Sequence, residues 1–335
     1  MPDPFNPLKF GHDKLAKLGF SDPVNAASVL QSYLPPDIVS EVDWSSLKSE
    51  PTSFVSGQLE GSAADLLYSA RLCQGSEIKI YVLLEHQSTV DGWMPLRLLG
   101  YMTQIWQASR KQDPEAKTLP LILPVVLFQG PKEWNVVTHL GGLIADWETL
   151  HPSMQRSIPD LHYSVIDLSR MKPGEMTGTT AARAVLEMLK GAAEGNLLET
   201  VRRCLPLLAA LLQKGGQEAE LVRAMWIYIM NVDGSAGMKD VQGVLERSQH
   251  PELEGNYMST LEKLLNEREA EGEAKGEAKG IAEGEARGLA LGQIQLFEEL
   301  LGLEATPRET LAEKDLAALK VQLEELKKRF HRERS

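Results

Sequence analysis

Cysteine is scarce in this chain of 335 residues, which contains only Cys73 and Cys204. Two cysteines cannot build a disulfide framework, and these two have no metal-ligand spacing, so a disulfide-stapled secreted domain is excluded. His139, His151 and His162 show neither HxH nor HExxH spacing, which leaves a zinc site without support. The low cysteine content suits a reducing cytosol.

Long apolar runs are also lacking. The longest, Leu119 to Phe128, is too short to span a bilayer and contains two prolines. The N-terminus from Met1 to Pro7 has neither a basic region nor an apolar region of the kind found in signal peptides. The sequence therefore predicts a cytoplasmic protein that does not insert into a membrane.

Positive charge is in deficit, with 35 Lys and Arg against 47 Asp and Glu and a net charge of −12. This balance counts against a broad nonspecific grip on nucleic acid, which normally comes from basic side chains that neutralise phosphates. A local basic rim with a bound metal could still hold a nucleic acid, and the total includes a Glu-rich segment near the C-terminus. The motifs GxSxG and GxxxxGK[ST] are absent, which disfavours a serine hydrolase and a P-loop enzyme.

A β-hairpin is predicted in the first third of the chain. From Glu77 to Gln87 apolar residues alternate with more polar ones, the period-2 pattern of a strand. The run from Ala64 to Cys73 precedes it, and a short loop around Gly75 separates the two. Antiparallel pairing of the two runs is expected.

Two carboxylates are predicted to face each other on this hairpin. If the loop is Gln74, Gly75 and Ser76, then Asp65 lies opposite Glu85, and opposed like charges are destabilising unless something neutralises them. A divalent cation would do so, and Gln87 points to the same side as Glu85. The alternatives are a solvated polar face or a register shifted by one residue. Asp13 is interpreted as a cap or surface residue.

A series of motifs follows in order between roughly residues 10 and 170 and resembles the bacterial recombination-promoting nuclease family, also labelled YhgA-like putative transposases. The motifs are His12-Asp-Lys-Leu-Ala-Lys, Phe20-Ser-Asp-Pro23, Leu34-Pro-Pro, Asp65-Leu-Leu-Tyr, Leu83-Leu-Glu85-His-Gln87-Ser, Arg97-Leu-Leu-Gly-Tyr101-Met-Thr-Gln-Ile-Trp106 and Leu119-Pro-Leu-Ile-Leu-Pro-Val-Val-Leu-Phe-Gln-Gly130 with Trp134.

The resemblance implies an α/β fold with a PD-(D/E)XK restriction-endonuclease-like core, a mixed sheet with flanking helices. It places Asp65, Glu85 and Gln87 in the catalytic motif. Asp65, Glu85 and the backbone carbonyl of His86 would hold Mg2+ or Mn2+. Gln87 stands where the wider superfamily usually has Lys, so this position can orient water or phosphate by hydrogen bonds but brings no charge.

The element order expected from periodicity agrees with such a core. Short helices are predicted between residues 9 and 32, a strand near 53–59, the hairpin, an amphipathic helix over 93–110 with Leu96, Leu99, Ile105 and Trp106 on one face, and a buried strand over 119–128. Residues 1–170 would form the nuclease-like domain. Residues 171–250 would form a helical subdomain, with helices over 181–189, 197–213, 218–231 and 238–247.

Glycine recurs every fourth residue from Gly272 to Gly292, within a Gly/Ala/Glu-rich segment over 251–300. Each interior glycine costs a helix roughly 0.8–1 kcal/mol relative to alanine, so an isolated helix here should fray. Two interpretations stay open, a flexible linker or a helix that packs against a second copy of the chain.

The last segment, 301–335, is predicted to be an amphipathic helix after a capping box at Thr306 to Glu309. Its apolar residues follow a 3-4 spacing, which suits either a homodimer through the C-terminal helices or a seam that folds back on the helical subdomain. These residues are Leu316, Leu319, Leu323, Leu326 and Phe330.

We therefore expect a Mg2+-dependent DNA endonuclease that hydrolyses phosphodiester bonds and promotes recombination or transposition. The alternative is a catalytically inactive nuclease fold that serves as a DNA-binding or protein-interaction module assembled through its C-terminal helices. A DDE transposase is disfavoured because Asp65 and Glu85 lie on one hairpin and no third acid is placed for that fold.

Overall fold

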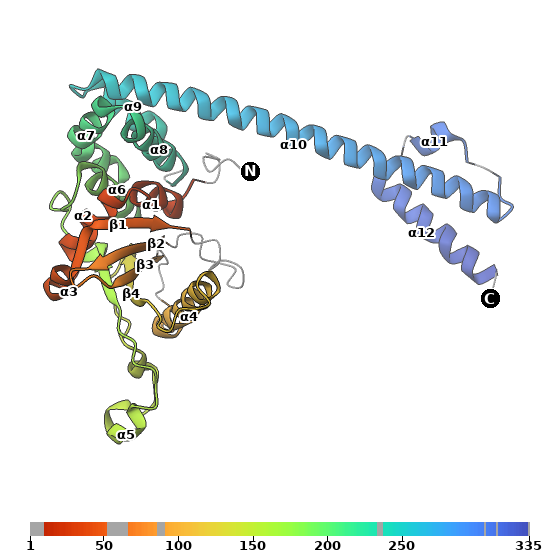
Figure 1. The fold of residues 1–335 in the computed structure, drawn as a ribbon. Coiled ribbons are helices and arrows are strands. Elements are labelled where there is room, and N and C mark those ends of the chain that lie inside the picture. The colour runs from red at the N-terminus through yellow and green to blue at the C-terminus, as the bar shows by residue number, and fades with distance from the viewer. Residues whose placement is uncertain are drawn as a thin grey trace. The chain divides into compact units, whose positions relative to one another are not determined.

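A mixed sheet organises the first part of the structure, a computed structural model that describes residues 10–51, 66–85, 91–232, 237–304, 306–312 and 314–333 (Figure 1). Contacts between residues divide the chain into two compact units, Met1–Glu262 and Lys263–Ser335. The sheet lies in the first unit, and its strands follow in sequence order from one edge to the other. They are β1 (Val42–Glu50), β2 (Leu66–Leu72), β3 (Glu77–Glu85), β4 (Leu121–Phe128) and β5 (Ser164–Asp167).

The pairing of neighbouring strands changes from antiparallel to parallel at β3. The β1–β2 and β2–β3 pairs are antiparallel, whereas β3–β4 and β4–β5 are parallel. Parallel pairing requires a crossover, and α4 (Met94–Gln112) supplies the crossover between β3 and β4. The predicted α/β class with a mixed sheet and flanking helices is confirmed, while the PD-(D/E)XK core stays a prediction.

Helices cover both faces of the sheet. On one face, α4 packs against a cluster that includes Leu83, Val126 and Phe128. On the other, α1 (His12–Phe20) and α2 (Pro23–Tyr33) bring apolar side chains to Val82 and Leu127. Strand β4 is therefore apolar along almost its whole length, as predicted for a strand with both faces covered.

The apolar face predicted for α4 is partly wrong. Leu96 is 52% exposed, because the buried residues fall on helical positions i, i+4, i+7, i+8 and i+11 counted from Met94, and Leu96 points away from that stripe. Leu99 and Trp106 pack against the core as predicted. The buried residues of this stripe are Met94, Leu98, Tyr101, Met102 and Ile105.

The predicted hairpin register is also wrong. Glu77 pairs with Arg71, and the Leu72 N–H donates to the Ser76 carbonyl over 2.7 Å, so the loop is residues 73–75. Gly75 has φ +99°, and its N–H donates to the Leu72 carbonyl. A three-residue loop closes with its last residue at positive φ, which selects glycine there rather than in the middle. The derivation that placed Asp65 opposite Glu85 therefore fails.

The strand predicted near 53–59 lies outside the described residues. On the side away from β3, β2 pairs with β1, a strand that was not predicted because Asp43, Ser45 and Lys48 give it little apolar alternation. Its register shifts between Asp43 and Lys48, as is common in edge strands.

The remaining elements of the first unit are short connections and a helical bundle. The four predicted helices between residues 181 and 247 are confirmed, with ends displaced by one to a few residues. The bundle consists of α6 (Thr180–Ala193), α7 (Leu197–Lys214), α8 (Gly216–Val232) and α9 (Gly237–Glu246). The connections are α3 (Pro36–Glu41), η2 (Leu140–Leu143), η3 (Trp147–Thr149), α5 (Pro152–Gln155) and η4 (Leu168–Arg170).

The second unit is built on the C-terminal part of α10 (Pro251–Leu300), with α11 (Arg308–Ala312) and α12 (Leu316–Glu333). The apolar seam packs against α10 within the same chain, where Leu319 and Leu323 meet Ala290 and Ile294. Thr306 donates its N–H and its hydroxyl to Glu298 of α10, over 2.9 and 2.6 Å. This contact replaces the predicted capping box.

Candidate active site at the carboxyl ends of the parallel strands

A buried carboxylate ends the central strand. Glu85 is the last residue of β3, follows a continuous apolar run and is only 2% exposed. A buried charge is costly unless a counter-charge or hydrogen bonds compensate it. Nη1 of Arg97 lies 3.0 Å from Oε2 of Glu85 and supplies that counter-charge.

Arg97 comes from the first turns of α4 and has several acceptors. Its Nη1 also lies 3.6 Å from Oδ2 of Asp91, and its Nε lies 3.4 Å from the Tyr101 hydroxyl. The guanidinium carbon lies 5.9 Å from the centre of the Tyr101 ring. Burial lowers the pKa of Arg97, but Tyr101 and Glu85 outweigh it and the net direction is upward. Arg97 therefore remains a cation, and its side chain is 24% exposed.

A second polar group lies at the end of the neighbouring strand. Gln129 directly follows β4, and its N–H donates to the Glu85 carbonyl over 2.9 Å. Its Nε2 lies 2.6 Å from Nδ1 of His12, and the same ring nitrogen lies 2.7 Å from the Tyr228 hydroxyl. Within the described part of the chain, the buried Oε1 of Gln129 has no hydrogen-bond partner. The contacts connect α1, β4 and α8.

These two polar sets lie on opposite sides of one sheet edge. Side chains alternate along a strand, so Glu85 projects to the side of Leu83 and α4, whereas Gln129 projects toward α1. The edge is formed by the carboxyl ends of parallel strands, the usual position of ligand sites in α/β sheets.

Only one of the predicted site residues is described by the structure. Glu85 lies at the predicted strand end, while Asp65, His86 and Gln87 lie outside the described residues. Their convergence on one metal ion stays a prediction.

Asp13 was interpreted as a cap or surface residue, but it is neither the N-cap of α1 nor fully exposed. The N-cap of α1 is Gly11, and one carboxylate oxygen of Asp13 is buried. Asp13 follows His12, which contacts Gln129. Asp13 is therefore a partly buried acid in the first turn of α1.

Arg97 and Gln129 were not predicted to be site residues. Both carried a signal, because Gln129 ends an apolar strand in the same way as Glu85 does, and Arg97 opens the helix that follows Glu85. Periodicity marks such positions only as polar. Pairing them requires the strand order and the helix crossover, which the sequence pattern leaves open.

The one predicted ligand that the structure describes, Glu85, suits a hard cation. Carboxylate and carbonyl oxygens are the ligands that Mg2+ and Mn2+ prefer, and Glu85 offers a buried carboxylate. Among the residues that the structure describes, no group of three or more His, Cys, Asp or Glu could hold a metal. The metal site stays a prediction, because Asp65 and His86 lie outside the described residues.

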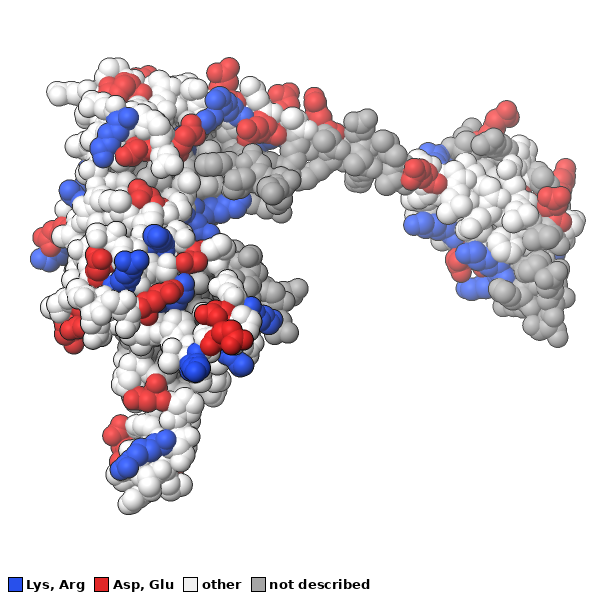
Figure 2. All heavy atoms as spheres, in the orientation of Figure 1, with Lys and Arg blue, Asp and Glu red and all other residues white. Residues whose placement is uncertain are grey.

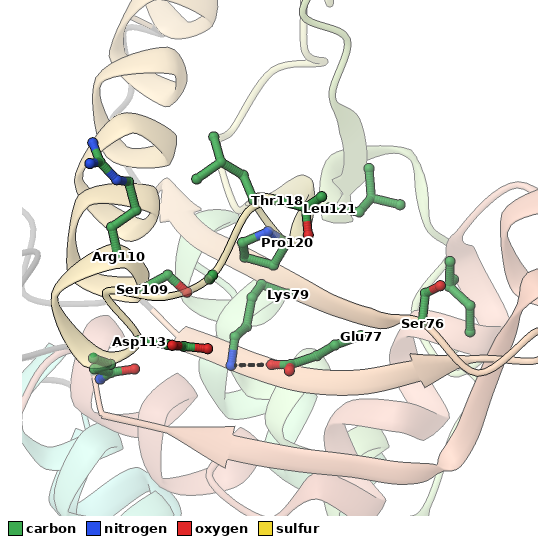
Figure 3. Close-up of a pocket in the computed structure, with 13 residues that line it drawn as sticks. Ser76, Glu77, Lys79, Ser109, Arg110, Asp113, Thr118, Pro120 and Leu121 are labelled. Carbon is green, nitrogen blue, oxygen red and sulfur yellow. Dashed lines mark ion pairs between the residues drawn. The ribbon is translucent and has the colours of Figure 1, made fainter.

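A cavity of about 620 Å³ lies at the other end of β3, near Glu77 (Figure 3). Its charges are balanced within the cavity wall, because Nζ of Lys79 lies 2.7 Å from Glu77 and 3.5 Å from Glu50, and Arg110 and Asp113 both line it. On the face drawn in Figure 2, basic and acidic side chains of the described residues are interspersed. Neither feature offers a strongly basic surface to a nucleic acid.

The similarity to known proteins covers the part of the chain that contains the sheet and the candidate site. The family described as "Putative transposase, YhgA-like" matches residues 11–219. The chain is 29% identical over 263 residues to the recombination-promoting nuclease RpnA of Escherichia coli strain K12, covering 77% of this chain and 84% of RpnA. It is 28% identical over 184 residues to RpnD of Escherichia coli O157:H7, covering 53% of this chain and 66% of RpnD.

A third relative carries a different name. The inactive recombination-promoting nuclease-like protein RpnE of Escherichia coli strain K12 is 26% identical over 258 residues, covering 76% of this chain and 82% of RpnE. No solved structure matches the chain. Because the family match covers more than half of the sequence and includes all five strands, the chain belongs to the YhgA-like putative transposase family.

Proposed function

We propose that this protein is a metal-dependent DNA endonuclease of the PD-(D/E)XK type, which uses Mg2+ or Mn2+ and promotes recombination by breaking DNA. The observation that carries the proposal is the buried Glu85 at the carboxyl end of β3, beside the partly exposed Arg97. The names of RpnA and RpnD, recombination-promoting nucleases, support the same class of activity.

The residues have separate roles in this proposal. Asp65, Glu85 and the His86 backbone carbonyl hold the ion, and Gln87 orients the attacking water or the scissile phosphate through its amide. Bound Mg2+ or Mn2+ would activate water and stabilise the charge that develops on the phosphate. Gln129 and His12 fix the end of β4 next to Glu85, so the strand edge is held in place before substrate arrives.

The remaining proposals concern location and assembly. Both cysteines are free, which supports action in the reducing cytoplasm. No described helix is long and apolar enough to cross a membrane. A homodimer would use α10, because the seam of α12 is already packed within the chain.

A second candidate is an inactive nuclease fold that binds DNA or protein. The name of RpnE, with coverage close to that of RpnA, and the net charge of −12 favour it. This candidate keeps the fold and the polar strand edge but has no turnover.

Nicking of supercoiled plasmid separates the two. Purified protein is tested with Mg2+, Mn2+, Ca2+ or EDTA beside Asp65→Ala and Glu85→Ala variants whose folding is checked by circular dichroism. The endonuclease requires Mg2+ or Mn2+, and both variants lose nicking. Nicking that persists in folded Glu85→Ala protein contradicts the assignment, and absence of nicking with every metal favours the inactive fold.

A further inference from the structure

Arg97 shares a carboxylate with the proposed metal site. Its Nη1 lies 3.0 Å from Oε2 of Glu85, so a cation already occupies one side of the carboxylate proposed as a metal ligand. Glu85 is almost fully buried, and in such surroundings the mutual repulsion of two cations is poorly screened. A divalent ion on Glu85 would therefore weaken the contact with Arg97.

Arg97 has other hydrogen-bond acceptors near its guanidinium. Oδ2 of Asp91 lies 3.6 Å from Nη1 of Arg97, and the Asp91 side chain is itself partly exposed. The Tyr101 hydroxyl lies 3.4 Å from Nε of Arg97. Both contacts are longer than the bond to Glu85. The Arg97 side chain is 24% exposed, so its guanidinium can turn toward solvent by side-chain rotation while the backbone of α4 stays in place.

A second buried ion pair in the first unit joins Glu187 of α6 to Arg203 of α7. Glu187 accepts two hydrogen bonds from Arg203, at 3.1 and 2.9 Å, and a third from the Gly174 N–H at 2.6 Å. A backbone donor and a two-pronged contact hold that pair in place. Nη1 of Arg97 donates to Oε2 of Glu85 over 3.0 Å, and this pair lies where the parallel strands end.

We propose that Arg97 is a phosphate-binding residue that exchanges partners. Without metal it neutralises Glu85; with metal on Glu85 it turns outward and binds the non-bridging oxygens of the scissile phosphodiester. The planar guanidinium suits phosphate because it donates two parallel hydrogen bonds. This inference rests on the proposed nuclease function.

The test measures metal binding and cleavage separately. Calorimetric titration with Ca2+ alone reports metal binding without turnover, and plasmid nicking in Mg2+ reports kcat and KM. The proteins are wild type, Arg97→Gln, Arg97→Lys and, as a matched control, Arg110→Gln, which changes an exposed arginine on the same helix that lines the cavity at the far end of β3.

We expect opposite effects in Arg97→Gln: Ca2+ binds at least threefold more tightly because the competing cation is gone, and KM for plasmid rises at least tenfold. Arg97→Lys keeps Ca2+ affinity near wild type but raises KM, since an ammonium lacks the planar fork. Arg110→Gln changes neither quantity. If Arg97→Gln fails to fold, the Arg97→Lys values decide.

Other outcomes overturn the inference. A loss of both Ca2+ binding and nicking in folded Arg97→Gln would make Arg97 a structural support of Glu85, and unchanged values would remove it from the site. If wild type binds Ca2+ and cleaves while Arg97→Gln behaves in either of these ways, only this inference fails. If wild type neither binds Ca2+ nor cleaves, the proposed function fails and the inference fails with it.

Discussion

The buried acids Asp167, Glu298 and Glu85 have different partners. Asp167 accepts hydrogen bonds from the backbone of Trp134 and Ser169, and Glu298 accepts both groups of Thr306, so these carboxylates connect segments of the fold. Glu85 is paired with Arg97, whose side chain is 24% exposed. A buried carboxylate paired with an arginine at the end of a strand is a candidate functional group.

Tyr228 is expected to make the protein less stable at alkaline pH. Burial raises its pKa above the ordinary value of about 10, against a smaller lowering by Gln129. Above pH 10 the unfolded chain loses this proton while the folded chain keeps it, so the free energy of unfolding falls as pH rises. Below pH 10 this contribution is fully present.

The variant Tyr228→Phe tests this expectation. Loss of the hydrogen bond to His12 should lower the free energy of unfolding by about 0.5–1.5 kcal/mol near pH 8. The fall in stability between pH 10 and pH 11 should be shallower than in wild type, because one titrating group is gone. Urea unfolding at both pH values measures this, and an equally steep fall would contradict the role of Tyr228.

The Glu85 position could be predicted at the residue scale, whereas its partners could not. An acid that ends an apolar run is visible in the sequence, and so is its place in the family motif. Arg97 and Gln129 reach Glu85 only through a helix crossover and a strand pairing, and neither leaves a local pattern. The hairpin failed by one loop position, because turn chemistry places Gly75 last and periodicity is silent about it.

At the element scale, close packing between α6 and α7 requires a glycine. A Cβ on Gly191 would fall within the Thr200 side chain, so Gly191→Ala should destabilise the protein by about 1–2 kcal/mol despite the better helix propensity of alanine. Gly100 of α4 is the matched control. Apart from its chain neighbours and the backbone of its own helix, no described atom lies within 4 Å of its Cβ position, and Gly100→Ala should stabilise the protein by up to about 1 kcal/mol.

Urea unfolding of both glycine variants provides the comparison. Opposite signs are expected at the two positions. If Gly191→Ala were as stable as wild type, the close approach of α6 and α7 would not hold in solution.

The glycines of α10 test the two interpretations of the repeat. Apart from chain neighbours and the backbone of α10 itself, no described atom lies within 4 Å of a Cβ built on Gly272, Gly284, Gly288 or Gly292. Replacing all four with alanine should stabilise the helix by about 3–4 kcal/mol, seen as a higher melting temperature by circular dichroism.

The proposed homodimer adds a second expectation for the same variant. If two copies of α10 approach closely at these glycines, four methyl groups hold them apart and weaken self-association in sedimentation experiments. Greater helicity with unchanged association would contradict a dimer built on α10.

On the scale of the whole molecule, the first unit extends beyond the family match. The match ends at residue 219, yet the unit continues to Glu262 and includes Tyr228, whose hydroxyl bonds to His12 at the start of the match. The helical bundle therefore helps to hold the strand edge. Its helices were predictable from amphipathic periodicity, but their contact with the site depends on tertiary packing.

The charge of the whole molecule agrees with a local site rather than a broad DNA-binding surface. With a net charge of −12, contact with DNA would depend on a bound metal and a few cations such as Arg97. Because few phosphates would be neutralised, nicking should weaken only shallowly as salt is raised, and its dependence on Glu85 should far exceed its dependence on Glu77, the other acid of β3.

The most direct test compares the two ends of β3 under one condition. Nicking of supercoiled plasmid in Mg2+ is measured for wild type, Glu85→Gln and Glu77→Gln, the last being an exposed acid at the start of the same strand. The account predicts at least a hundredfold loss for Glu85→Gln and a rate within twofold of wild type for Glu77→Gln. Equal rates for folded Glu85→Gln and Glu77→Gln proteins would contradict the site at the carboxyl end of β3.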